Sequence, residues 1–533
     1  MARIAVIGAG MGAMAAAARL AATGHRVVVH ERGPAHGGAV GRLERDGFAF
    51  DTGPGLLHLP AVYRDLFVKT GKETLEQCVE LVQVDPAGRH VFADGTDVLL
   101  PGASRAGVLQ ALDAAFGPGA SERWSGLERR AREVWDATRR PLLEEPLADD
   151  ARALHDDPYP APARRAPLGL RRRGRAPAGL AEAARRELRD PRLAAVLESH
   201  ALGHGLDPRA APASAAVLAY VAQTFGTWYV RGGMRALADA LYERCRARGV
   251  EFVFGSEVVG VVEKDGRAAG VELADGAQVQ ADLVVAGVAP ARLRSVPGAV
   301  PEPGADGGPG TDSGPGTDSA AGSGGSGRFT VFLALRGARP EGAAHRTVVH
   351  AADRDAELAA VFGGGARRRG RGGPGGAQAV RRPCDRPTLT VLRPDDPATR
   401  PDSGHEAVTL TATVAPHGPV DWAEAAAAGR YADALTEAAE AAIPGLRDRV
   451  LWRVVHTPCD TAEATGAPGG AVPGPALAGG GGRYLRPGNL TRLPGLYLAG
   501  GWAHPGGGLP HAGMSGALVA GLIVEGADWR GSR

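Results

Sequence analysis

The amino-acid sequence predicts an α/β protein in which a nucleotide-binding domain is assembled from separate parts of the chain. Two glycine-rich turns support this prediction, one near each terminus, and each follows a short apolar run and precedes a helical pattern. The length of 533 residues is enough for two or three domains. Between the turns, strand-like and helical segments alternate, so a mixed α/β architecture is expected throughout.

The first turn lies between an apolar run at residues 4–7 and an alanine-rich helical segment, and a second strand follows at residues 26–31. This is the strand, turn, helix and strand order of a Rossmann-like dinucleotide-binding unit. Gly8 permits the tight turn, and Gly10 lets the backbone reach a pyrophosphate. Met11 and Gly12 continue the turn, and Ala13 allows close packing of helix on strand. Glu31, which ends the second strand, is expected to bind the adenosine ribose hydroxyls.

The residues after Glu31 carry two further features. Arg32 offers the alternative of a 2′-phosphate site, but the adjacent carboxylate would repel that phosphate. A second glycine pair, Gly37 and Gly38, follows, and a nicotinamide dehydrogenase has no need for it. The pair lets the chain pass close to an extended pyrophosphate and ribityl chain. A third glycine-containing segment follows it and comprises Asp51, Thr52, Gly53, Pro54 and Gly55.

Composition excludes several functions. The formal net charge is only +2, which gives no electrostatic case for nucleic-acid binding. The four cysteines are far apart and form no metal or redox motif, which is typical of a reducing cytosol. No segment has the roughly 20 uninterrupted apolar residues of a membrane span, and the apolar N-terminal run is better explained as the first strand than as a signal peptide. The sequence therefore predicts a cytoplasmic protein without a metal site.

Residues 101–225 are predicted to form a helical subdomain that faces the substrate or a membrane. It contains a basic stretch of nine arginines between residues 164 and 189. One interpretation is a solvated loop and helix face. The alternative is peripheral contact with anionic lipid headgroups on the inner face of the membrane, to which each basic residue adds about 1 kcal/mol.

From residue 226 the chain returns to α/β character. A helix after Arg-Gly-Gly-Met at residues 231–234 is followed by strands at 250–254 and 257–262, a hairpin and a strand at 283–286. Residues 297–327 and 363–382 are low-complexity stretches, which predict disordered insertions. Strands at 329–335, 388–392 and 407–415 and a helix at 422–442 predict a second sheet.

The second glycine-rich turn lies in Leu-Ala-Gly-Gly-Trp-Ala-His-Pro-Gly-Gly-Gly-Leu-Pro at residues 498–510. It follows a short apolar strand, and residues 515–523 are expected to form a helix. Backbone amides can approach a bound cofactor here without side-chain obstruction. The predicted contacts from this turn are Gly500, Gly501, His504, Gly507, Gly508, Leu509 and Pro510.

These segments predict a discontinuous domain layout. The cofactor domain comprises residues 1–100, 226–296 and 483–533, and residues 328–482 form an inserted substrate domain with a mixed sheet. The helical subdomain lies between the first two cofactor segments.

Four motifs together make this sequence similar to a known family. They are the N-terminal turn, the double glycine with its Asp-x-Gly-Pro element, the Arg-Gly-Gly-Met segment and the C-terminal His-Pro-Gly-Gly-Gly-Leu-Pro. It resembles the carotenoid desaturases of the phytoene desaturase type, which are FAD-dependent relatives of the amine oxidases. The resemblance implies extended, noncovalent FAD, with adenosine near Gly8–Ala13 and Glu31 and the flavin ring near Asp51–Gly55 and Gly500–Pro510. It also places Val258 on the strand next to the adenine. The sequence departs from the family pattern at Ala39, where a basic residue is common, and Arg42 is a candidate substitute.

The implied reaction removes a hydride and a proton from adjacent carbons of a long apolar polyene, with flavin as the hydride acceptor. Such a substrate gives a charged group little to hold, so positioning is expected to dominate. The sequence identifies no catalytic base. His504 and His511 are candidates, and a structural role for His504 in the glycine loop is favoured. Trp228 and Tyr229 are interpreted as either tunnel wall or core.

Three functions remain open. The first is desaturation of phytoene or of a later intermediate such as a 1-hydroxycarotenoid. The second is oxidation of an amine or another small substrate, which would require polar groups and an aromatic cage. The third is a prenyl-lipid carrier without redox chemistry, against which the intact cofactor motifs argue.

Overall fold

The computed structural model describes residues 1–102, 104–148, 150–161, 163–165, 171–173, 176–293, 325–364 and 381–531. The side chains of residues 163–165 and 171–173 are outside this description. Most of the two predicted low-complexity insertions, 297–327 and 363–382, lies outside the described residues.

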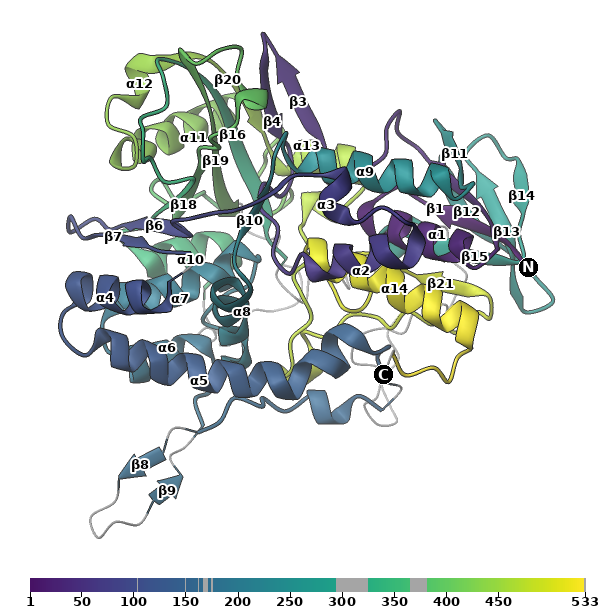
Figure 1. The fold of residues 1–533 in the computed structure, drawn as a ribbon, viewed down its shortest axis with the longest axis horizontal. Helices are drawn as coiled ribbons and strands as arrows, with labels where there is room; N and C mark the ends of the chain where they lie inside the picture. Colours follow the sequence, from purple (N-terminus) through teal and green to yellow (C-terminus); the bar gives the residue numbers. More distant parts are fainter. Residues whose placement is uncertain are drawn as a thin grey trace, which may run out of the picture.

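A five-stranded parallel sheet forms the centre of the cofactor part, on the right of Figure 1. Its strands come from three distant parts of the chain, as predicted. Val6 and Val29 point to one face and pack on helices, whereas Ala5 and Ile7 pack on the other face against a three-stranded antiparallel sheet. The strand order is β11 (Glu251–Phe254), β2 (Arg26–Glu31), β1 (Arg3–Ile7), β15 (Leu283–Ala286) and β21 (Leu496–Leu498). The three-stranded sheet comprises β12 (Val258–Lys264), β13 (Arg267–Leu273) and β14 (Gln278–Gln280).

Helices cover the first face of this sheet. The small residues of the alanine-rich segment let most of α1 lie buried between its neighbours, because alanine and glycine side chains allow close backbone approach. Gly516 lies so close to α1 that a Cβ there would come within 2.5 Å of the Gly12 carbonyl oxygen. These helices are α1 (Met11–Ala22), α2 (Ala61–Thr70), α3 (Leu75–Cys78), α9 (Met234–Ala247) and α14 (Leu509–Glu525).

A seven-stranded mixed sheet forms the second part, at the upper left of Figure 1. Alternate residues of its long strand β16, such as Phe329 and Val331, pack on helix α11, and the opposite face of the sheet points toward the middle of the molecule. The strand order is β20 (Val450–His456), β16 (Gly327–Arg336), β19 (His405–Val414), β18 (Leu389–Leu392), β17 (Arg346–Val349), β6 (Gly88–Val91) and β7 (Asp97–Leu100). Its helices are α10 (Arg354–Phe362), α11 (Ala425–Ala438), α12 (Leu446–Arg449) and α13 (Pro458–Thr465).

The strands β6 and β7 correct the predicted layout. The sequence prediction placed residues 1–100 in the cofactor domain, but β6 pairs in parallel with β17 of the second sheet. The hairpin of β3 (Arg42–Arg45) and β4 (Phe48–Asp51) also leaves the cofactor part, because Phe48 and Phe50 pack on Phe332. The two parts are thus joined by exchanged strands as well as by linkers. A two-stranded pairing of β5 (Leu81–Gln83) with β10 (Trp228–Val230) adds to this connection.

The predicted helical subdomain lies below both sheets in Figure 1. Its apolar faces form a separate core around Leu112, Trp124 and Leu197. It comprises α4 (Arg105–Phe116), α5 (Ala120–Arg139), a π-helical turn η1 (Arg140–Glu144), α6 (Leu180–Leu188), α7 (Pro191–Gly203) and α8 (Val217–Phe225). Two short strands, β8 (Ala163–Arg165) and β9 (Arg171–Arg173), project away from it. In the described part of the chain, we find no helix with the length and apolar character needed to cross a membrane.

Candidate functional site

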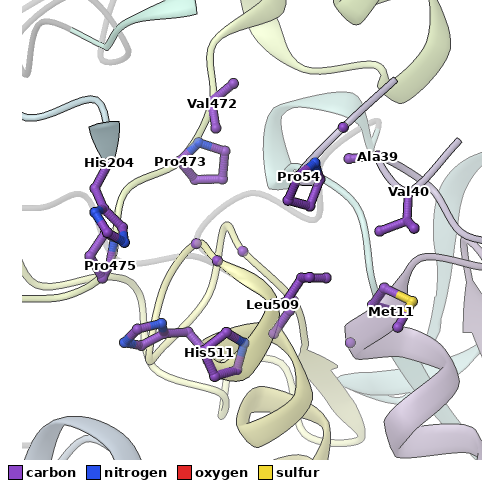
Figure 2. A pocket seen from close by; sticks show the side chains of 18 of the residues that line it. Met11, Ala39, Val40, Pro54, His204, Val472, Pro473, Pro475, Leu509 and His511 are labelled. Carbon is purple, nitrogen blue, oxygen red and sulfur yellow. The ribbon is translucent and has the colours of Figure 1, made fainter. Parts of the chain in front are cut away.

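One cavity of about 660 Å³ lies where the cofactor part, the mixed sheet and the helical subdomain meet. Figure 2 shows its wall. Met11, Ala39, Val40 and Pro54 lie on one side, His204 and Pro475 lie on the other, and Leu509 and His511 lie between the two groups. Most of the predicted cofactor contacts line this cavity: Gly8, Gly10, Met11, Gly12, Glu31, Arg32, Gly37, Gly38, Gly53, Pro54, Gly55, Val258, Gly500, Gly501, Gly507, Gly508, Leu509 and Pro510.

The N-terminal turn presents bare backbone to the cavity. A Cβ built on Gly10 would meet no atom within 4 Å, although Gly10 lines the cavity wall. Helix α1 starts immediately after it and has no side-chain cap, so the first amide groups of the helix are left for a ligand. This is the arrangement that a pyrophosphate requires.

The double glycine lies directly against this turn. The Gly37 amide donates to the Ala9 carbonyl oxygen at 2.8 Å, and a Cβ on Gly38 would lie 3.0 Å from the Gly10 Cα. Arg235 fixes the same loop from helix α9, where its Nη1 donates to the His36 carbonyl oxygen at 2.7 Å. This contact was not predicted from the sequence, because Arg235 lies 199 positions from His36 along the chain.

Glu31 holds the turn as well as facing the cavity. Its Oε2 accepts a hydrogen bond from the Ala9 amide at 2.7 Å, and its Oε1 accepts one from the Gly33 amide at 2.8 Å. Each carboxylate oxygen has a second lone pair, so the predicted ribose contact is compatible with these bonds. Arg32 reaches away from Glu31 and donates to the Glu463 carbonyl oxygen.

Four predicted contact residues lie outside the cavity wall: Ala13, Arg42, Asp51 and His504. Ala13 packs under the sheet, where a Cβ on Gly287 would come within 2.6 Å of its methyl group. The Arg42 guanidinium pairs with Glu44 and donates to the Gly232 carbonyl oxygen, so it does not take the place of the missing basic residue at position 39.

Asp51 caps helix α9. Its carboxylate accepts hydrogen bonds from the Met234 amide at 2.9 Å and from the Arg235 amide at 3.3 Å. The Arg-Gly-Gly-Met segment therefore joins the glycine-rich Asp51–Gly55 loop to the helix that fixes the double glycine. Trp228 and Tyr229 are part of this framework and do not line the main cavity, and the Tyr229 hydroxyl donates to Asp396 at 2.8 Å.

The C-terminal glycine loop is braced by the segment at residues 473–476. The Ala476 amide donates to the Pro505 carbonyl oxygen, and the Gly507 amide donates to the Gly474 carbonyl oxygen, both at 2.9 Å. A Cβ on Gly507 would lie 1.7 Å from the Pro473 carbonyl oxygen. Helix α14 begins at Leu509, earlier than the expected residue 515, and it has no side-chain cap at its cavity end. The positive end of its dipole therefore faces the cavity.

His504 supports this loop from inside the protein. It is fully buried, and its Nε2 lies 3.0 Å from the Glu145 carbonyl oxygen. Its own carbonyl oxygen accepts hydrogen bonds from Asn489 and Ser515. These bonds agree with the structural role favoured from the sequence. His511, by contrast, lines the cavity, and its Nδ1 has no hydrogen-bond partner among the described residues.

Acid destabilisation of the fold is a first testable prediction. Burial lowers the pKa of five histidines to about 3 or 4: His58, His345, His350, His504 and His511. Between about pH 6.5 and pH 4 the unfolded chain then binds protons that the folded chain does not, so the free energy of unfolding decreases as the pH falls through this window. Burial raises the pKa of Asp51 to about 6 and also raises the pKa values of Glu128, Asp157 and Glu357, and these carboxyl groups act in the opposite direction.

We therefore expect a loss of several kcal/mol between pH 7 and pH 5, since each pKa unit corresponds to about 1.4 kcal/mol. Thermal unfolding of the flavin-free protein at a series of pH values measures the effect. A midpoint at pH 5 that equals or exceeds the midpoint at pH 7 would contradict it.

The cavity also contains a polar region that sequence reasoning missed. It is formed by the inner face of the mixed sheet and by helix α7, and it includes Arg328, Arg346, His200 and His204. Threonines cover the sheet between the arginines, at Thr330, Thr390, Thr411 and Thr413. The alternating threonines at 409, 411 and 413 are a sequence signal for a polar strand face, but the face they cover could not be located from the sequence.

A dinucleotide fits the geometry of the first region. The bare Gly10 backbone and the uncapped first turn of α1 suit a pyrophosphate, and Glu31 and Val258 line the cavity beyond them. The double glycine continues the same backbone surface toward the C-terminal loop. The wall therefore suits an extended ligand that runs from Glu31 to the start of α14.

Comparisons with known proteins agree with this geometry. Residues 14–306 match the family model described as flavin containing amine oxidoreductase. A hydroxyneurosporene desaturase of Rhodobacter capsulatus is 29% identical over 98% of this chain and 97% of its own length. A phytoene desaturase (neurosporene-forming) of Cereibacter sphaeroides is 26% identical over 98% of this chain and 95% of its own length.

Solved structures share the fold. A putrescine oxidase variant superposes with a TM-score of 0.59 at 16% identity and covers 98% of this chain and 99% of its own. An oxidoreductase from Methanosarcina mazei has a TM-score of 0.58 at 18% identity, with 97% and 99% of the two chains covered. The match to the family model extends over more than half of the sequence; it begins after the first glycine turn and includes Glu31, the double glycine and the Asp51–Gly55 loop. The chain therefore belongs to the flavin-containing amine oxidoreductase family, and its similar full-length relatives include carotenoid desaturases.

Proposed function

We propose that this protein is an FAD-dependent desaturase that removes a hydride and a proton from adjacent carbons of a carotenoid. The observation that carries the proposal is the continuity of the cavity, which joins the dinucleotide site to an apolar channel. The channel lies beneath α5, η1 and α8 and is lined by Val134, Trp135, Leu142, Leu143, Val217, Leu218 and Val221. A long apolar chain in this channel would end beside the C-terminal glycine loop. The full-length similarity to desaturases supports the same activity.

FAD is the form of flavin that the cavity favours. FMN lacks the adenosine and would leave the Glu31 and Val258 end of the cavity unused. Bound FAD would supply the hydride acceptor. The protein would hold the pyrophosphate on the amides at the start of α1, and the positive end of the α14 dipole would stabilise negative charge near the C-terminal loop.

The described residues of the channel offer no carboxylate for proton removal. Among the described residues that line the cavity, the only carboxylates are Glu31 and Glu257. Glu31 is at the adenosine end, and Glu257 is adjacent to Val258 on the same side. Burial lowers the pKa of His511 to about 3, so this histidine is neutral and only a weak base. Positioning of the substrate is therefore the main contribution that the described residues would make to the reaction.

Oxidation of an amine is less compatible with this cavity. An ammonium substrate would meet the two guanidinium groups of Arg328 and Arg346, which repel it. Tryptophan, tyrosine and phenylalanine are represented among the described lining residues only by Trp135 and Trp502, so an aromatic cage is not formed there.

Peripheral membrane contact would give an apolar substrate a route to the channel. The basic stretch between residues 164 and 189 belongs to the same helical subdomain as α5 and α8. Several of its arginine side chains are outside the described part of the structure, so this contact stays a prediction from the sequence.

Expression in cells that accumulate phytoene tests the proposed activity. We expect phytoene to be replaced by carotenoids of longer conjugation, identified by mass and by absorption at longer wavelength. If phytoene persists, later intermediates such as a 1-hydroxycarotenoid are supplied in its place. An unchanged pigment pool with all of these substrates, in cells that contain flavin-loaded protein, would overturn the proposal.

A further inference from the structure

The polar region of the cavity is an unusual environment for a hydrocarbon. Strand register places Arg328 and Arg346 on the same face of the mixed sheet. Arg328 pairs with Thr413 of β19, and Val348 of β17 pairs with Thr390 of β18. Val348 lies two residues after Arg346, so the two side chains share a face. Strands β19 and β18 separate the two arginines. Both side chains line the cavity, so any ligand that extends over this sheet face meets two cations.

Within the part of the chain that the structure describes, Arg346 has no partner for its charge. Among the described residues, its side chain makes no hydrogen bond and no ion pair, and a Cβ on Gly88 would lie 3.2 Å from its Nη1. Arg328 has partial compensation, because it donates to the Thr413 hydroxyl at 2.8 Å and to the Gly203 carbonyl oxygen at 2.5 Å. Burial lowers the pKa of each guanidinium only to about 10, so both stay charged at neutral pH. A buried cation without a counter-charge is costly unless a ligand supplies one.

Histidines surround Arg346 and do not neutralise it. Burial is the main reason why the pKa values of these histidines are low, and the charge of Arg346 lowers them further, so they are uncharged at neutral pH. This group comprises His58, His90, His200, His204 and His350. Neutral imidazoles can donate one hydrogen bond each. The described surroundings of Arg346 thus offer positive charge and donors, and they provide no carboxylate.

The described carboxylate on α7 already has a charged partner. Glu198 forms an ion pair with Arg354, and both residues, together with His350, line a separate small cavity. It is therefore not the partner of Arg346, and the uncompensated charge belongs to the main cavity.

We propose that this enzyme binds polyenes with a terminal carboxylate in preference to neutral ones: Arg346 would hold the carboxylate, and the apolar chain would extend through the cavity to the channel under α5 and α8. This inference rests on the proposed function and adds acidic polyenes to its substrate class, beside neutral carotenoids such as phytoene. Arg328 and the threonines of β16, β18 and β19 provide a polar surface along the way. A guanidinium forms charge-assisted hydrogen bonds with a carboxylate, which a neutral hydrocarbon cannot replace.

Retinoic acid and its methyl ester are the probes for a binding test, because they share one polyene chain and differ in charge. Equilibrium binding to the flavin-loaded protein is followed at pH 7.5 by quenching of tryptophan fluorescence. We expect the acid to bind at least about 10-fold more tightly than the ester. In Arg346→Met, the affinity for the acid should fall to that for the ester, while the affinity for the ester stays within about twofold.

Matched variants control for indirect effects. Arg26→Met removes an exposed arginine on the remote strand β2 and should keep the preference for the acid. Arg346→Lys keeps the charge and should retain part of the preference, which also tests the site if Arg346→Met fails to fold. Equal affinity of the native protein for acid and ester would overturn the inference, as would a full preference in Arg346→Met. Loss of flavin from Arg346→Met would overturn it too, because the guanidinium would then serve the cofactor.

Two further measurements distinguish failure of the acid site from failure of the proposed function. Sodium acetate at about 100 mM should not displace retinoic acid, because a chain-linked carboxylate gains affinity from burial of its apolar chain. Displacement by acetate would indicate a site for small free anions and would overturn the substrate assignment. Preference for retinoic acid in a protein that desaturates no carotenoid would support the acid site and reject the proposed function. Desaturation of phytoene without any preference for the acid would support the proposed function and reject the acid site.

Discussion

Replacement of Gly10 by valine is expected to abolish flavin binding and leave the fold intact. Gly10 has an ordinary extended backbone conformation, with φ of −72° and ψ of 165°, so a valine causes no backbone strain there. A Cβ at this position meets no protein atom within 4 Å. The valine side chain would instead occupy the space through which a pyrophosphate approaches the start of α1. We expect flavin affinity to fall at least about 100-fold, which corresponds to about 2.7 kcal/mol.

Flavin content and thermal unfolding together measure this effect. The purified variant should lack flavin absorption, and its unfolding midpoint should equal that of the native protein stripped of flavin. Gly10→Ala is the graded control, since one methyl group should weaken binding less than a valine side chain does. A Gly10→Val protein that retains stoichiometric flavin would show that the cofactor does not pass over this turn.

Replacement of Gly507 by alanine is expected to damage the site through the fold itself. The added Cβ would lie 1.7 Å from the Pro473 carbonyl oxygen and 2.5 Å from the Pro473 carbonyl carbon. These are backbone atoms, which cannot move aside as a flexible side chain can. The segment at 473–476 must therefore separate from the C-terminal loop, to which the hydrogen bonds from Ala476 and Gly507 hold it. We expect a loss of about 1 to 3 kcal/mol of stability.

The cavity should change as well, because Pro473, Pro475 and Gly507 all belong to its wall. Carotenoid turnover should fall by a larger factor than flavin content. Gly429→Ala provides the matched control, since Gly429 lies within helix α11 and a Cβ there meets nothing within 4 Å. That change should be neutral or stabilise by up to about 1 kcal/mol. A Gly507→Ala protein as stable and active as the native one would contradict the described contact.

The two substitutions distinguish two roles of glycine in this protein. At Gly10 the missing side chain leaves room for a ligand, and at Gly507 it leaves room for another segment of the chain. Both positions lie in motifs that were evident in the sequence, but the sequence did not distinguish their roles.

Prediction from the sequence was most successful where structure is local. The strand, turn and helix at residues 3–22 follow from apolar residues, a glycine turn and an alanine-rich segment, and they were found as β1 and α1. The second sheet was predicted from strands at 329–335 and 407–415, which form β16 and β19. Pairing partners were harder to predict. Strand β6 carries no local feature that selects β17, more than 250 residues away, over the cofactor sheet.

The same limit applies to the site. The family resemblance placed the flavin ring near Asp51–Gly55, and Asp51 was among the predicted cofactor contacts. The structure shows that it caps α9, and a cap can be recognised only when the helix it serves is known. Arg42 was a candidate for a missing cation, but it is engaged by Glu44 and the Gly232 carbonyl oxygen.

The sequence by itself determined the glycine-rich turns at which we propose that an extended dinucleotide binds, because each turn is specified by a few adjacent residues whose small side chains leave the backbone accessible. Only the tertiary structure decided what the rest of the cavity holds. Arg346 and Arg328 are ordinary strand residues in the sequence, and their charge becomes informative when the sheet and α7 enclose them without a carboxylate. The physical reason is that the cost of an unpaired charge depends on burial and on neighbours distant in the sequence, neither of which a local pattern contains.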